Sequence, residues 1–107
     1  MTPHGLTNMT KLEVIVGGED SPAVADLFRS SGASGYTSVS GVSGLGHAGH
    51  HQGRLLFNQK AALELLITVV SPQRAEALIT GLRELLDSTP GVMFVTDTYV
   101  SRPEYFT

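Results

Sequence analysis

The fold is decided by the stretch Leu63-Glu-Leu-Leu-Ile-Thr-Val-Val-Ser-Pro72, which joins an apolar run to a helix start. The run ends in β-branched residues and predicts a strand over about Leu63–Val70. Ser71-Pro72 is typical of an N-cap followed by proline at the first helical position. Fifty residues earlier, Ser21-Pro22 follows the alternating segment Lys11-Leu-Glu-Val-Ile-Val16 in the same way. The second half of the chain therefore repeats the first.

Each predicted helix is followed by a break and then a strand. Gly32 is a natural stop for the first helix, and a strand over Tyr36–Val42 follows it. Pro90-Gly91 breaks the second helix before the strand Val92–Val100. The order is β-α-β twice, and each unit can close only by pairing with the other. The sequence therefore predicts an α+β, ferredoxin-like βαββαβ fold, with a four-stranded antiparallel sheet and two helices on one face.

The length of 107 residues predicts one domain, over residues 11–107. Met1–Thr10 is polar and without period, and is expected to be a flexible tail. Met9 is an alternative natural start. Glycine gathers in the middle of the chain, which predicts a mobile loop over about residues 41–60.

Composition excludes several classes of protein. The chain has no cysteine, a net charge of −3 and 41% hydrophobic residues. These values exclude disulfides and disfavour disorder or a basic nucleic-acid-binding surface. No run of about 18 apolar residues is present, so no membrane span is expected. With no signal-peptide pattern at the N-terminus, we expect a cytoplasmic protein.

Charge is unevenly distributed along the chain. No acidic residue lies between Asp26 and Glu64, an interval that holds three basic residues, three histidines and seven glycines. A weakly basic, glycine-rich segment suits a backbone that approaches an anion closely. A plain flexible loop explains the same composition, so both interpretations stay open.

The chain contains no recognisable catalytic set, and we expect it not to be an enzyme. Gly44-Leu-Gly46-His-Ala-Gly49 spells the dinucleotide pattern, but no helix begins after it. Arg102 follows the last strand directly and precedes Pro103, so its guanidinium could clamp a phosphate or carboxylate. A surface salt bridge is the alternative for Arg102.

Three histidines, His47, His50 and His51, form the only histidine cluster. Imidazoles at this spacing can share a metal ion, but no carboxylate or cysteine is near to complete the shell. Histidines in a glycine loop are more often exposed, so no metal site is expected.

Three segments resemble those of PII-type signal-transduction proteins: Ala33-Ser-Gly35-Tyr36-Thr37, Val42-Ser-Gly44-Leu-Gly46 and Gly91-Val-Met-Phe-Val95-Thr-Asp97. In that family, the first segment lies at the start of the second strand, the second segment lies at its end, and the third forms the last strand. The modified tyrosine-bearing loop and the glutamine for 2-oxoglutarate have no counterpart here. The chain looks more like the divergent PII-like branch linked to bicarbonate uptake and carboxysomes.

The resemblance implies a non-enzymatic regulator that forms a homotrimer and binds ADP or AMP in clefts between subunits, without a cofactor. It places Gly35, Tyr36 and Thr37 on the adenine side. The residues that it places beside the ribose and phosphates are Gly44, Gly46, His47 and Gly91. Arg102 is only in approximate register with the phosphate-binding arginines of the family. Arg54 and Lys60 are candidates for a second anion, bicarbonate.

Val92 stands where the family has a lysine, so ADP or AMP should bind better than ATP. The expected partner is a target protein such as a bicarbonate transporter or a carboxysome component. The alternative is a metal-responsive trimer resembling copper-tolerance proteins, which would use His47, His50 and His51.

Overall fold

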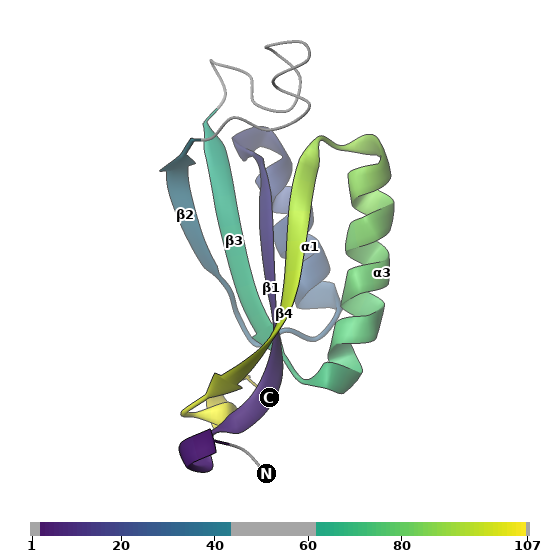
Figure 1. The fold of residues 1–107 in the computed structure, drawn as a ribbon. Helices are drawn as coiled ribbons and strands as arrows, with labels where there is room; N and C mark the ends of the chain where they lie inside the picture. Colours follow the sequence, from purple (N-terminus) through teal and green to yellow (C-terminus); the bar gives the residue numbers. More distant parts are fainter. Residues whose placement is uncertain (1–2, 44–61, 107) are drawn as a thin grey trace.

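The computed structural model describes residues 3–43 and 62–106. Four strands, β1 (Thr7–Gly17), β2 (Thr37–Val42), β3 (Leu63–Val70) and β4 (Gly91–Val100), form one antiparallel sheet in the order β2-β3-β1-β4. The helices α1 (Ser21–Ser30) and α3 (Pro72–Ser88) cover one face of this sheet (Figure 1). The predicted ferredoxin-like arrangement is confirmed.

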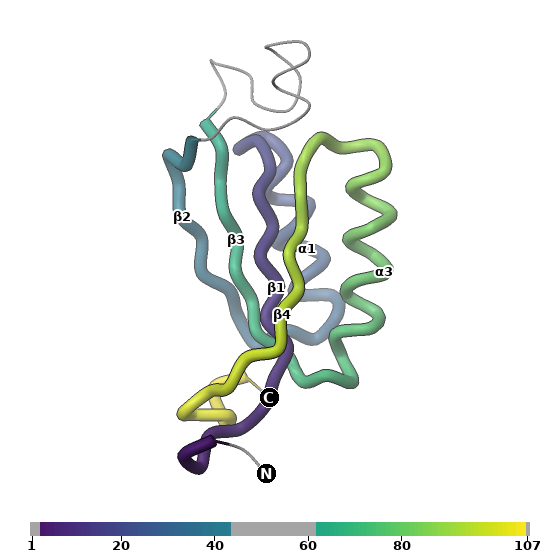
Figure 2. Tube along the Cα trace, in the orientation of Figure 1, coloured from purple at the N-terminus to yellow at the C-terminus, as the bar shows by residue number. Residues whose placement is uncertain are grey.

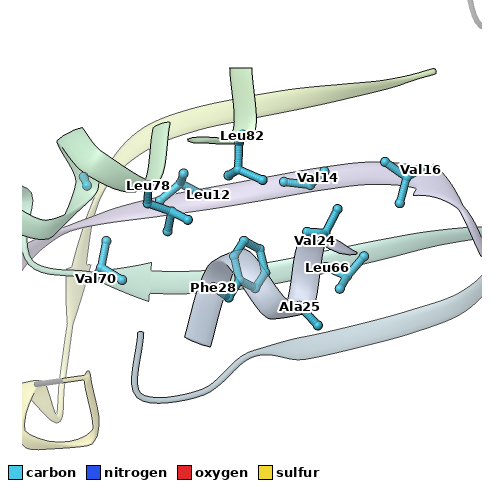
Figure 3. Close-up of a cluster of buried hydrophobic side chains, with 11 residues drawn as sticks. Leu12, Val14, Val16, Val24, Ala25, Phe28, Leu66, Val70, Leu78 and Leu82 are labelled. Atoms are coloured by element: carbon cyan, nitrogen blue, oxygen red, sulfur yellow. The ribbon is translucent and has the colours of Figure 1, made fainter. Parts of the chain in front are cut away.

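The core lies between the sheet and the two helices (Figure 3). Leu12, Val14 and Val16 alternate along β1 toward the helices and are fully buried. Successive side chains of a strand point to opposite faces, so this alternation fixes which face of β1 is covered. The helices contribute Val24, Ala25, Phe28, Ala75, Leu78 and Leu82, and β3 contributes Leu66 and Val70.

The two Ser-Pro pairs begin their helices differently. Ser71 is an N-cap, and its hydroxyl oxygen accepts a hydrogen bond of 3.3 Å from the backbone N–H of Arg74. Ser21 was expected to cap α1 in the same way, but it is the first residue of the helix. A 3-10 turn, η2 (Gly18–Asp20), precedes it, and the Ser21 hydroxyl donates to the carbonyl of Gly18 at 3.0 Å. Because this turn leads directly into α1, Asp20 takes the N-cap position and Ser21 lies inside the helix.

The predicted flexible tail over residues 1–10 is wrong from Thr7 onward. Strand β1 begins at Thr7, four residues before the expected start, and pairs with the end of β4 up to Val100. Met9 and Thr10 are buried. The cause is the length of β4, whose last residues offer backbone partners that a local reading of the polar N-terminus does not reveal. Figure 2 shows this two-stranded extension leaving the body of the sheet.

A bulge marks the end of β2. The pairing with β3 shifts between Ser40 and Val42, and Gly41 lies between them with φ of 75°. Glycine adopts this left-handed conformation without the steric cost that a Cβ brings. Gly41 and Val42 thus belong to the strand, and the rest of the predicted mobile loop, residues 44–60, lies outside the described residues.

The second face of the sheet is not covered by the helices and carries an apolar row. The register places Val39, Leu65, Ile15 and Val92 side by side across all four strands on this face, which we call the open face. Phe94, two residues beyond Val92, lies on it too and is 52% exposed.

Neither described helix is long and apolar enough to cross a membrane.

Candidate functional site

A hollow of about 360 Å³ lies where β2 begins and β3 ends. Residues 34–37 and 67–69 form two of its walls, and the C-terminal turn η3 (Pro103–Phe106) supplies Tyr105 and Phe106 to a third. The predicted residues Gly35, Tyr36 and Thr37 therefore line one cavity together. The sequence did not assign Tyr105 and Phe106 to a site, because their approach depends on the long β1–β4 extension that carries the C-terminus back.

Two hydrogen bonds from other elements hold the segment that enters the hollow. The Thr68 hydroxyl donates to the carbonyl oxygen of Gly35 at 2.7 Å. The guanidinium of Arg74, on α3, donates to the carbonyl of Gly32 at 2.7 Å. Because residues 32–36 have no ladder partner of their own, these side chains satisfy carbonyls that the sheet leaves free. Neither Thr68 nor Arg74 was recognised from the sequence, since both act on backbone far away in the chain.

Tyr36 is anchored on the core side. Its ring contacts the buried ring of Phe28 edge-on, with centroids 5.8 Å apart and an interplanar angle of 61°. Arg29 lies nearby and donates a 2.6 Å hydrogen bond to Asp26. Asp26 and, to a lesser degree, the side chain of Tyr36 raise the pKa of the Arg29 guanidinium. Arg29 is thus an ion-paired residue in the last turn of α1.

Arg102 lies beside the hollow through Tyr105. Its guanidinium carbon is 5.7 Å from the centroid of the Tyr105 ring, and the Tyr105 backbone N–H donates to the Arg102 carbonyl at 3.0 Å. A guanidinium over a ring face is attracted by the negative charge of the π system. A guanidinium carries five N–H donors, so one that contacts a ring in this way can still donate to an anion. The predicted Arg102 and the Gly35–Thr37 segment are thus brought to the same end of the sheet.

Gly91 lies elsewhere. It opens β4 opposite Val16, whereas Gly35 precedes β2, and these strands are the two edges of the sheet. Three strand spacings separate the edges, roughly 14 Å. A Cβ on Gly91 would meet Val16 Cγ1 at 2.7 Å and the Ile15 carbonyl oxygen at 2.8 Å, so close packing on β1 already requires glycine here. One chain therefore does not bring Gly91 to the hollow.

The remaining candidates, Gly44, Gly46, His47, Arg54 and Lys60, lie outside the described residues, as do His50 and His51. Within residues 3–43 and 62–106, no three histidine or carboxylate side chains gather as metal ligands would. The described hollow is lined by aromatic, aliphatic and hydroxyl-bearing side chains, and Arg102 lies against one of the lining residues, Tyr105. Such a site suits a flat ring that carries an anionic group.

The fold and this hollow define a small α+β protein with a candidate site at the edge of a ferredoxin-like sheet. The family model for nitrogen regulatory protein P-II matches residues 9–105. The chain belongs to the P-II family. Comparison with the curated proteins finds no match.

Solved structures extend this result. CPII from Thiomonas intermedia K12, bound to ADP and bicarbonate, is 33% identical over 95% of this chain and 97% of its own, with a TM-score of 0.80. CPII bound to ADP, AMP and acetate is also 33% identical, over 94% and 96%, with a TM-score of 0.78. A putative PII-like signalling protein from Thermus thermophilus is 19% identical over 95% and 98%, with a TM-score of 0.75, and shares the fold. The predicted resemblance to PII-like proteins is confirmed, and the chain is a PII-like regulatory protein.

Proposed function

We propose that this chain is a non-enzymatic signalling protein that binds ADP or AMP between the subunits of a homotrimer and responds to bicarbonate. The observation that carries the proposal is the hollow shared by Gly35, Tyr36, Thr37 and the C-terminal turn. It coincides with the segment that the family resemblance assigns to adenine. The CPII structures hold ADP, AMP and bicarbonate on the same fold at about one-third identity.

The open face supports assembly. Val39, on the apolar row that runs across the sheet, is 44% exposed, and Phe94, beside that row on the same face, is 52% exposed. Burial of apolar surface stabilises association by about 25 cal/mol per Å² before the cost of ordering. P-II proteins form trimers. We therefore assign the open face to contacts between copies of the chain.

The separation of Gly91 from the hollow supports a site between subunits. The two candidate groups lie at opposite edges of one sheet, so a nucleotide that contacts both must touch two copies of the chain. One copy would supply residues 35–37 and Arg102, and its neighbour would supply Gly91 together with Gly44, Gly46 and His47. Backbone N–H groups of glycine segments suit phosphate oxygens.

The direct test is calorimetric titration of the purified protein with ADP, AMP and ATP, with Zn²⁺ and Cu²⁺ as further ligands. We expect one nucleotide per chain, with ADP or AMP bound more tightly than ATP because Val92 replaces a cation. A ligand at a hundred times its Kd should add about 2.7 kcal/mol of stability. Absence of binding by all three nucleotides would overturn the proposal. One metal ion bound tightly per chain would favour the metal-responsive alternative.

The expected target is a protein of inorganic-carbon uptake, a bicarbonate transporter or a carboxysome component, and we place the regulator in the cytoplasm with it. The support is the resemblance to the branch that serves this process, together with the bicarbonate present in the CPII structures. Affinity capture with and without ADP, with the partner identified and its affinity then measured, tests this assignment.

A further inference from the structure

The C-terminal turn is built so that Arg102 and Tyr105 face each other. Pro103 between them fixes one backbone torsion, and the 3.0 Å bond from the Tyr105 N–H to the Arg102 carbonyl closes the turn. The guanidinium then lies over the ring, 5.7 Å from its centroid. This arrangement holds the ring in place from within the turn.

The ring is held at the hollow yet remains largely uncovered. Tyr105 lines the cavity opposite the start of β2 and is 62% exposed, more than any other large apolar or aromatic side chain in the described part of the chain. An ordered aromatic surface beside a cavity is a stacking platform for a flat ligand. Tyr36, the aromatic residue of the β2 wall, already packs edge-on against Phe28.

We propose that Tyr105 stacks on the base of the bound nucleotide and that Arg102 is its positioning residue. This inference rests on the proposed function, since it names the residue that recognises the base in that site. The Arg102 guanidinium lies over the ring, and its N–H groups would donate to a phosphate of the same ligand. The turn therefore couples recognition of the base to recognition of the charge.

Calorimetric titration with ADP tests the stacking. Tyr105→Ala should weaken ADP binding at least about fivefold, as expected for loss of one base–aromatic stack. Tyr105→Phe keeps the ring and should stay within twofold of the wild type. Tyr99→Ala is the matched control, because Tyr99 is an exposed tyrosine of β4 that does not line the hollow. Equal ADP binding by Tyr105→Ala and the wild type overturns the inference, as does an equal loss in Tyr105→Phe.

Tyrosine fluorescence gives a second readout that a purely structural role would not move. The chain has no tryptophan and three tyrosines, so its emission is tyrosine emission. ADP should quench the wild type, and part of that quenching should disappear in Tyr105→Phe although its affinity is retained. Inorganic pyrophosphate, which has no base, should not produce this component. Undiminished quenching in Tyr105→Phe contradicts stacking on Tyr105.

A double-mutant cycle tests the positioning role. Arg102→Ala should weaken ADP binding by a smaller factor in the Tyr105→Ala background than in the wild type, with at least about a threefold difference. Additive effects would remove the positioning role of Arg102. If the wild-type protein binds neither ADP nor AMP, the proposed function itself fails. If the wild-type protein binds ADP and Tyr105→Ala binds it equally well, the proposed function stands and only this inference is lost.

Discussion

The hydroxyl of Thr68, on β3, donates a 2.7 Å hydrogen bond to the carbonyl oxygen of Gly35, thirty-three residues earlier in the chain. Thr68 is 2% exposed, so the donor of this bond is buried, whereas the Gly35 residue that accepts it is exposed. Gly35 is the first of the three residues that carry the predicted adenine contact. The position of the candidate site therefore depends on a buried side chain that does not have to touch the ligand.

Thr68→Val should destabilise the fold and displace the wall of the hollow. Valine has nearly the shape of threonine but cannot donate, so the Gly35 carbonyl loses its partner. Loss of such a part-buried hydrogen bond costs about 0.5–1.5 kcal/mol. Urea unfolding measures this loss, and ADP titration should show weaker binding. Thr68→Ser is the matched control, because it keeps the hydroxyl, and it should retain more of the nucleotide affinity than Thr68→Val.

Gly91→Ala should destabilise the protein by about 1–3 kcal/mol through overpacking. Its Cβ would lie 2.7 Å from Val16 Cγ1 and 2.8 Å from the Ile15 carbonyl oxygen. Gly35→Ala is the opposite case, because its Cβ would meet no atom within 4 Å. Its unfolding free energy should change by less than about 0.5 kcal/mol. Thermal or urea unfolding of both variants checks the pair, and equal stabilities would contradict the packing role of Gly91.

Local sequence patterns were sufficient to predict the order and type of the helices and strands of this fold. The alternation of Leu12, Val14 and Val16 gave the buried face of β1, and Ser71-Pro72 marked the start of α3 correctly. The start of β1 was wrong because Thr7 becomes a strand residue only through pairing with Val100, at the far end of the chain. Such a contact leaves no local trace in a polar segment.

The site was predicted in part for the same reason. Gly35, Tyr36 and Thr37 are contiguous, so one motif identified three residues that line one cavity. Tyr105 joins them only through the curvature of the β1–β4 extension, and Thr68 and Arg74 join through bonds to distant carbonyls. Gly91 could be assigned to the same site from family likeness, but its place at the opposite sheet edge requires the topology.

Phe94→Lys should dissociate the proposed homotrimer while keeping the monomer folded. Phe94 is on the open face opposite Glu13, so a lysine there gains a favourable cross-strand partner within the chain. Between copies, the same charge would have to leave water, and the apolar contact of the ring would be lost, worth about 1.5–3 kcal/mol in each copy. Sedimentation equilibrium should give the 11.3 kDa chain instead of three times that mass.

The control for this variant is Val95→Lys. Val95 is the next residue of β4, is 42% exposed and points to the other face of the sheet. It should leave the wild-type mass unchanged. A wild-type protein that sediments as a monomer at all concentrations would remove the basis for a site between subunits.

Arg102→Ala should weaken ADP binding and leave the fold intact. A hydrogen bond from a charged donor contributes about 1.5–3 kcal/mol, which corresponds to roughly a tenfold to 150-fold loss of affinity. The guanidinium is exposed at the chain end, so its removal creates no cavity in the core. Arg83→Ala, on the exposed side of α3, is the matched loss of one arginine and should bind ADP as the wild type does. ADP affinity equal in the two variants would exclude Arg102 from the site.

Bicarbonate and ADP should each strengthen the binding of the other. Arg54 and Lys60 are the candidate cations for bicarbonate, and they belong to the same chain segment as the phosphate candidates Gly44, Gly46 and His47. If one arrangement of that segment binds both ligands, the coupling is reciprocal by thermodynamic linkage, and a typical coupling is about 1–3 kcal/mol. We therefore expect ADP to bind roughly 5- to 150-fold more tightly when bicarbonate is saturating.

The measurement is ADP titration at constant pH and ionic strength with bicarbonate or with chloride in its place, on the wild type, Arg54→Ala and Lys60→Ala. Fixed ionic strength matters because salt alone screens the attraction between arginine and phosphate. A variant that removes the bicarbonate contact should keep the ADP affinity measured in chloride and lose the increase caused by bicarbonate. If the two sites are independent, the wild type will bind ADP with equal affinity in bicarbonate and in chloride. That result would exclude coupling between bicarbonate and the nucleotide site. Coupling that survives in both single variants and in the double variant would place the second anion on other residues.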